Sequence, residues 1–236
     1  LFGLNHPVTA ESINNLGFLM QVRGSNKKAI QYFKQALEIR EKLFGHNNYY
    51  TAISYSNLGR SLYSTGEILE AISCYKKTVE IRQNVLGLTH ADTISSLFHL
   101  GNLLNEKGDF DGERKVYEQL LEVYKASFGE ESLDISLVFN KLGLIQKKQK
   151  KFKEAKIYYL QSLRIRSKLL GKEHLDTVLI LNNLGELMQK MGNYEKARLL
   201  LEKTVEISKR TLGEEHQTTV MYINNLGRLF QEMGRK

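Results

Sequence analysis

Hydrophobic residues recur along most of the chain at spacings of three and four, the pattern of helices with one buried face. The segment 181–205 contains two such stripes, separated by Gly192. The first stripe is Leu181, Leu184 and Met188, and the second is Tyr194, Ala197, Leu200, Leu201 and Val205. This pattern predicts a helix, a short turn at Gly192 and a second helix.

The helix–turn–helix unit recurs with a period of 42 residues, which three series of glycines mark without any insertion or deletion. One series is Gly3, Gly45, Gly87, Gly129, Gly171 and Gly213; the second is Gly17, Gly59, Gly101, Gly143, Gly185 and Gly227. The third is Gly24, Gly66, Gly108, Gly192 and Gly234, with Lys150 where its fourth glycine is due. Such a period over the whole chain predicts a stacked repeat array.

The register predicts an all-α solenoid of antiparallel helix pairs over residues 1–236, organised as a single array. The repeats run over 1–42, 43–84, 85–126, 127–168 and 169–210, followed by a partial repeat, 211–236. Because Leu1–Gly3 repeats the Leu43–Gly45 that ends a second helix, we expect the chain to be a fragment of a longer protein.

Four histidines occupy the same place in four repeats, just before the first helix: His6, His90, His174 and His216. We interpret them as helix-start residues and not as a metal site, because they lie whole repeats apart along the chain. Pro7, the only proline, fits the first turn of a helix, where its missing N–H costs nothing.

The glycines of the second series lie inside predicted helices, where glycine costs about 1 kcal/mol relative to alanine. We expect each to mark close approach of the partner helix backbone, matched on that helix by an alanine such as Ala197. The third repeat has Glu113 where the alanine belongs. We expect that repeat to be loosened or rotated, or Glu113 to reach the edge of the contact.

The fifth repeat resembles the tetratricopeptide repeat (TPR). The matching positions are Leu184, Gly185, Gly192, Tyr194, Ala197 and Leu201. The 42-residue form, with "LNNL", "ALEIREK" and the linker "LG-x-x-H", is similar to kinesin light chain and nephrocystin-3. The resemblance implies a right-handed superhelix that binds proteins, with the first helices lining a concave groove.

Carried over by position, the resemblance implies a peptide-binding groove built from residues around the "NLG" motif of each first helix. These are Asn14, Asn15, Phe18, Asn57, Arg60, His99, Asn102, Asn140, Lys141, Asn182, Asn183, Glu186, Asn224, Asn225 and Arg228. Asparagine is unfavourable inside helices, so its recurrence at one phase suggests a use. An amide can pair with the N–H and C=O of an extended peptide; alternatively, the asparagines bond to the neighbouring repeat and set its angle.

The charge of the chain indicates which kind of peptide to expect. The formal net charge is +8, and the run "KKQKKFKEAK", Lys147–Lys156, places six lysines around one turn. Together with Lys141, Lys190, Arg60 and Arg228 these favour an acidic peptide; the other reading is a solvated basic turn. Specific nucleic-acid binding is not expected, because no nucleic-acid-binding module is present.

Several function classes find no support in the sequence. There is no phosphate loop of the "GxxxxGK[ST]" type, no "HExxH" and no "GxSxG", so we expect neither catalysis nor a cofactor. Cys74 is the only cysteine, so a disulfide framework within the chain is excluded. We interpret Cys74 as a packing residue. No apolar run approaches the length of a membrane span. We expect a cytoplasmic protein, and the resemblance adds the cytoskeleton or the cilium as settings.

The leading hypothesis is therefore a protein–protein interaction scaffold or adaptor that binds an extended, acidic peptide of a partner in its concave groove. One alternative is an architectural spacer with edge, convex-face or terminal contacts, including self-association through the terminal repeats. Another is a sensor in which peptide binding changes the pitch of the superhelix.

Overall fold

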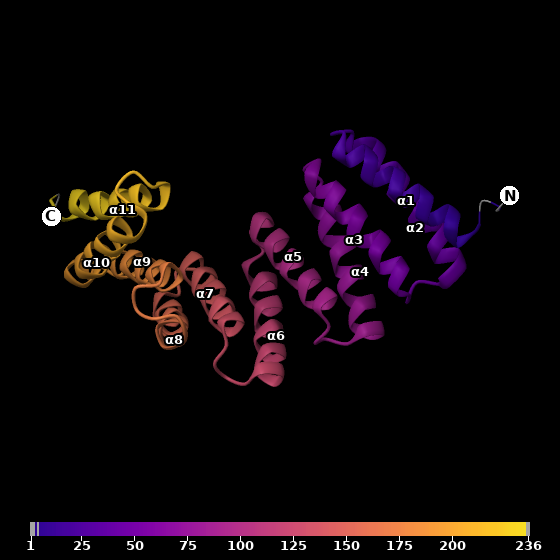
Figure 1. Cartoon of the computed structure of the whole chain (residues 1–236). Helices are drawn as coiled ribbons and strands as arrows, with labels where there is room; N and C mark the ends of the chain where they lie inside the picture. Colours follow the sequence, from indigo (N-terminus) through magenta and orange to yellow (C-terminus); the bar gives the residue numbers. More distant parts are fainter. Residues whose placement is uncertain (1–2, 4, 235–236) are drawn as a thin grey trace. The chain divides into compact units, whose positions relative to one another are not determined.

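The computed structural model describes residues 3 and 5–234, and this part of the chain folds into eleven α-helices and no strand (Figure 1). The helices are α1 (Pro7–Val22), α2 (Asn26–Phe44), α3 (Tyr49–Ser64), α4 (Ile68–Leu86), α5 (Ala91–Lys107), α6 (Phe110–Phe128), α7 (Leu133–Lys148), α8 (Phe152–Leu169), α9 (Leu175–Lys190), α10 (Tyr194–Leu212) and α11 (Gln217–Met233). The predicted all-α fold of helix pairs is confirmed. The expectation that Leu1 and Phe2 end a preceding helix lies outside the described residues.

Packing divides the chain into two compact units, the first ending at Val123 and the second beginning at Tyr124. In the first unit, α1 packs on α2 and α3 on α4, while α2 and α4 also contact the helix that follows each of them. In the second unit, α7 packs on α8 and α9 on α10, and again α8 and α10 contact the next helix. Contacts of this kind, between sequence neighbours, are typical of stacked repeats. A single array over residues 1–236 stays a prediction.

The recurring histidines cap the first helices. Nδ1 of His6, His90, His174 and His216 accepts a hydrogen bond from the backbone N–H two residues later, at 3.1 to 3.2 Å. The side chains of Asn48 and Ser132 act as N-caps at the corresponding places. Each cap pairs one of the backbone donors that the first turn of a helix leaves without a partner. Their interpretation as helix-start residues is confirmed.

The turn within a helix pair requires a residue in the left-handed region, and this explains the third glycine series except Gly234, which has φ −73° at the end of α11. Gly192 has φ 76° there, and Lys150, at the same place in the fourth repeat, has φ 60°. Lys150 is the one non-glycine residue with positive φ in the described part of the chain. A side chain in this conformation costs about 1–2 kcal/mol, so the fourth repeat has a strained turn.

Five of the glycines inside the first helices make room for a side chain of the partner helix, not for its backbone. A Cβ on Gly143 would lie 2.6 Å from the Tyr159 ring, and one on Gly185 would lie 2.7 Å from Leu201. Such distances are too short for any carbon contact. The expected backbone approach matched by alanine is therefore wrong: the space is needed for the aromatic or leucine side chain one turn beyond the alanine.

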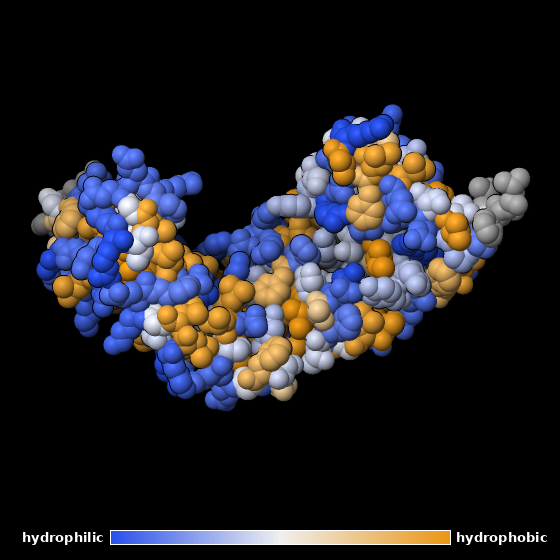
Figure 2. All heavy atoms as spheres, viewed as in Figure 1, coloured by the Kyte–Doolittle hydropathy of each residue, from blue (hydrophilic) through white to orange (hydrophobic). Residues whose placement is uncertain are grey.

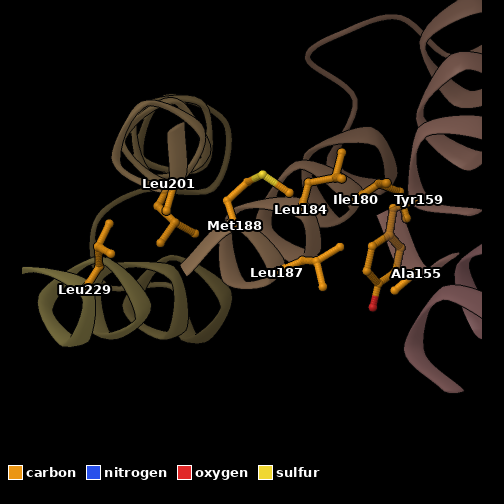
Figure 3. Close-up of a cluster of buried hydrophobic side chains, with 9 residues drawn as sticks. Ala155, Tyr159, Ile180, Leu184, Leu187, Met188, Leu201 and Leu229 are labelled. Carbon is orange, nitrogen blue, oxygen red and sulfur yellow. The ribbon is translucent and has the colours of Figure 1, made fainter. Parts of the chain in front are cut away.

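One hydrophobic core cluster of the second unit joins α8, α9, α10 and α11. Tyr159 of α8, Leu187 of α9, Leu201 of α10 and Leu229 of α11 are all fully buried in one cluster (Figure 3). Burial of each such side chain stabilises the fold by about 1.5–3 kcal/mol. Each helix thus shares its buried face with the helices before and after it.

Arginines on the second helices join one repeat to the next, a role that the sequence analysis missed. Nη1 of Arg40 donates to the Tyr50 carbonyl at 3.2 Å and to Ser54 Oγ at 2.9 Å. Nη1 of Arg166 donates to the Asp176 carbonyl at 2.8 Å. Burial lowers the pKa of both guanidinium groups. Arg40 and Arg166 occupy the same position of their repeats, three repeats apart, and this recurrence was the signal in the sequence that could have revealed their role.

Glu113 does not reach the edge of its helix contact, so that alternative is wrong, whereas a loosened or rotated third repeat stays a prediction. Its side chain is 3% exposed, and both carboxylate oxygens accept hydrogen bonds from Asn105 Nδ2, at 2.9 and 2.8 Å. A buried carboxylate is tolerated here because it is hydrogen-bonded. Cys74 is also buried, and burial raises the pKa of its thiol to about 11, which agrees with a packing residue.

Candidate functional site

The predicted groove residues all lie on the first helices of the pairs: α1, α3 and α5 in the first unit and α7, α9 and α11 in the second. We call the surface that these helices form the first-helix face of each unit. Six asparagines of the set are buried: Asn14, Asn57, Asn140, Asn182, Asn183 and Asn225. Phe18, Lys141 and Glu186 are partly buried, and Asn15, Arg60, His99, Asn102, Asn224 and Arg228 are exposed. The set therefore divides into an internal and an accessible part.

The buried asparagines pair with each other across adjacent repeats. Asn57 Nδ2 donates to Asn14 Oδ1 at 2.9 Å, which joins α3 to α1. In the second unit, Asn183 donates to Asn140 at 2.9 Å and Asn225 donates to Asn182 at 3.0 Å. These bonds agree with the reading in which the asparagines bond to the neighbouring repeat. Each bond uses one N–H and one lone pair, and Asn225 uses its second N–H on Glu186, so these buried amides serve packing between repeats.

In the first unit, accessible side chains form a connected group around Arg60. The guanidinium carbon of Arg60 on α3 lies 5.1 Å from the centroid of the Phe18 ring on α1, a cation–π contact. Burial and the positive charge of Arg60 lower the pKa of His99 on α5. The lowered pKa favours the neutral imidazole, and Arg60 contacts the Phe18 ring while its charge acts on His99.

Two further contacts place the rest of this group. The His99 ring lies 5.3 Å from the Tyr75 ring, centroid to centroid, which anchors the imidazole against α4. Asn102 is exposed, and its Oδ1 accepts a hydrogen bond from the Tyr117 hydroxyl at 3.4 Å. Asn15 on α1 is exposed as well. We call Asn15, Phe18, Arg60, His99 and Asn102 the Arg60 cluster.

In the second unit, Glu186 on α9 is the centre of the corresponding surface. Its carboxylate accepts hydrogen bonds from Lys147 Nζ at 2.9 Å, from Asn182 Nδ2 at 3.0 Å and from Asn225 Nδ2 at 3.0 Å. Arg228 in turn donates to Asn225 Oδ1 at 2.9 Å. The positive groups of this surface are thus already partnered within the protein, unlike Arg60 in the first unit.

The lysine-rich turn of the fourth repeat borders an open cavity of about 540 Å³. Its lining includes Lys150, Lys151 and Lys153 from this turn and Lys190 from the next repeat. Lys147, at the start of the basic run, instead pairs with Glu186. The turn therefore offers a local positive surface, while part of the run serves packing between repeats.

The described residues form neither a metal site nor a membrane-spanning helix. No group of three or more His, Cys, Asp or Glu side chains there could hold a metal ion. Within the same residues, none of the helices has the length and apolar character needed to cross a bilayer. On the face seen in Figure 2, apolar side chains reach the surface of both units among polar ones.

One protein-family model matches most of the chain. The family is described as the tetratricopeptide repeat, and its model matches residues 8–75, 50–126, 134–210 and 179–236. The overlapping matches follow consecutive helix pairs, as the 42-residue period requires. Comparison with curated protein sequences gives no match.

Several solved structures are similar in fold. A putative kinesin light chain with nearly identical TPR-like repeats from Podosopora anserina is 21% identical, with a TM-score of 0.73, over 88% of this chain and 98% of that chain. BtubC (BKLC) from P. vanneervenii is 21% identical, with a TM-score of 0.69, over 89% of this chain and 84% of that one. A signal transduction ATPase with a tetratricopeptide repeat sensor from Pyrococcus horikoshii is 18% identical, with a TM-score of 0.74, over 97% of this chain but 34% of that one. At these identities the likeness establishes the fold alone.

Proposed function

The chain belongs to the tetratricopeptide repeat family, and on that premise we propose that it binds an extended, acidic peptide of a partner protein on the first-helix face of its first unit. Proteins of this family are scaffolds that bind other proteins and are typically not enzymes. The observation that carries the proposal is the Arg60 cluster, in which an accessible arginine makes a cation–π contact with Phe18 and its charge acts on the nearby His99.

Arg60 is suited to bind a carboxylate. A guanidinium group presents its N–H donors in a planar fork that matches a carboxylate with two parallel hydrogen bonds. The contact with Phe18 restrains the guanidinium, and the side chain is exposed, so its N–H groups can reach a ligand. Among the described residues, no side chain accepts a hydrogen bond from the Arg60 guanidinium. The side chain is therefore oriented before any ligand arrives, which reduces the entropy cost of binding.

The neighbouring amides favour an extended peptide. Asn15 and Asn102 are exposed on α1 and α5, on either side of Arg60. Each carries both donor and acceptor groups, so they can pair with the backbone of an extended strand without selecting its side chains. Arg60 then selects acidic residues of the peptide, and the two amides bind its extended backbone.

The first unit is favoured over the second because of the internal pairing around Glu186. There, Lys147 and Arg228 already have partners, and a bound carboxylate would meet the negative charge of Glu186. In the first unit the Arg60 cluster contains no carboxylate. A negative ligand is thus attracted to the first unit and opposed at the centre of the corresponding surface in the second.

The test compares Arg60→Ala with Arg23→Ala, an exposed arginine at the C-terminal end of α1 that matches the change in charge. Acidic peptides retained on an array are measured in solution by fluorescence anisotropy. Loss of a hydrogen bond to a charged group costs about 1.5–3 kcal/mol, so Arg60→Ala should weaken binding by about 10-fold to 100-fold. Arg23→Ala should change it by less than about twofold.

Equal affinities for the two variants would contradict the proposal and favour contacts at the edge or at terminal repeats. Asn57→Ala is a poorer probe of the groove, because it leaves the buried Asn14 amide without its donor. That change costs stability, about 1–3 kcal/mol, whether or not a peptide binds.

A further inference from the structure

The second unit carries a separate apolar groove between α8 and α10. Leu160 of α8 and Leu199 of α10 form its walls, Leu184 and Met188 of α9 form its floor, and the cavity measures about 320 Å³. Figure 3 shows the two floor residues within the buried cluster of this unit. The walls are accessible: Leu160 is 45% exposed and Leu199 is 60% exposed.

Packing of the repeats does not require these two leucines. Three repeats earlier, the corresponding second helices, α2 and α4, carry Lys34 and Ser73 at the two wall positions. The floor positions there remain leucine, Leu58 and Leu62, and both are buried. The floor is thus set by the fold, whereas the apolar walls are particular to the second unit.

The rim of the groove is positive. Lys156 and Lys196 are the only charged residues that line it, one on each helix. Three repeats earlier their positions hold Ile30 and Glu70, so this charge is also particular to the second unit. Neither lysine takes part in an ion pair with any described residue, and both lie beside leucines that are open to solvent.

We infer that this groove docks an amphipathic helix of a partner protein, with leucine-type side chains along one face and aspartate or glutamate beside them. An apolar trough between two helices accepts a third helix through residues spaced three, four and seven apart. Burying the exposed leucines supplies the driving force, and Lys156 and Lys196 pair with the acidic flanks. This surface is independent of the Arg60 cluster.

The experiment uses the chain as given and a labelled synthetic peptide of about 20 residues, long enough to form a helix. One face of the peptide is leucine and the other is rich in glutamate; a matched peptide carries lysine in place of glutamate. Fluorescence anisotropy should show binding of the glutamate peptide and weaker binding of the lysine peptide. Leu160→Ser with Leu199→Ser should weaken the first by about tenfold or more.

Leu69→Ser is the matched control, because Leu69 is 61% exposed in the first unit and far along the chain from the groove. It should leave the affinity within about twofold. Lys156→Glu with Lys196→Glu keeps the leucines and should reverse the preference, so that the lysine peptide binds more tightly.

Three results would overturn the inference. The wild-type chain could fail to bind the glutamate peptide, or the charge-reversed variant could keep its preference. Light scattering could also show a dimer that the leucine double variant abolishes, which would make a second copy of this chain the occupant of the groove.

Discussion

At the residue scale, three substitutions within one repeated frame have different physical outcomes. Lys150 stands where other repeats have glycine and adopts a positive φ. Glu113 stands where they have alanine and is buried with a hydrogen-bond partner. His99 stands where four other repeats have asparagine and packs against the Tyr75 ring. In each case the helix or turn forms as in the other repeats, and the different side chain is either accommodated by a neighbouring group or strains the turn.

Lys150→Gly should stabilise the chain. The substitution removes the cost of a left-handed lysine, about 1–2 kcal/mol, and adds the entropy cost of glycine in the unfolded chain, so the net gain is about 0.5–1 kcal/mol. Urea denaturation followed by circular dichroism measures the change. Lys151→Gly, one residue further on with φ −85°, should bring no gain. A Lys150→Gly variant no more stable than the wild type would refute the strain.

At the scale of elements, each helix pair is held by a side chain of the second helix that fills the space over a glycine of the first. Tyr159 fills this space over Gly143, and Phe33 fills it over Gly17. The sequence predicted close approach at these glycines correctly but assigned it to backbone and alanine. A glycine in a helix signals missing volume; which neighbouring atom occupies that volume depends on how the two helices pack.

Gly143→Ala should destabilise the chain by about 1–3 kcal/mol, because its Cβ would overlap the fully buried Tyr159 ring and force repacking. Gly227 holds the same repeat position in α11, where a Cβ would meet no described atom within 4 Å. Gly227→Ala should instead stabilise by about 0.5–1 kcal/mol, as alanine does within an open helix. Thermal and urea denaturation of the two variants give the comparison, and equal effects would argue against the ring contact.

At the scale of the whole molecule, the chain consists of two packed units and a formal net charge of +8. Contacts between sequence neighbours make each unit a stack whose interfaces are largely local. The positive groups have two different roles. Lys147 and Arg166 bond to other residues between repeats. Arg60, Lys156 and Lys196 lie at surfaces where they can meet a negative ligand.

Binding of an acidic peptide should weaken with salt. Raising the NaCl concentration from about 0.1 M to about 1 M shortens the Debye length from about 10 Å to about 3 Å, which screens attraction between the basic protein and the ligand. Anisotropy titrations across this range should show a falling affinity. The same peptide with Asn for Asp and Gln for Glu serves as the control and should change little. A salt-independent affinity for the acidic peptide would argue against electrostatic recognition.

The sequence by itself determined the repeat period, the helix pairs, the histidine caps and the positions on the first helices. These follow from local chemistry: hydrophobic periodicity, the conformational needs of turns and the hydrogen bonds of a helix start. Only the tertiary structure decided how the candidate residues are used. It buried Asn57 against Asn14, enclosed Glu186 among donors and left Arg60 accessible over Phe18. An amide or a charge has the same local propensity in each setting, so only the neighbours that packing brings to it separate an internal bond from a binding site.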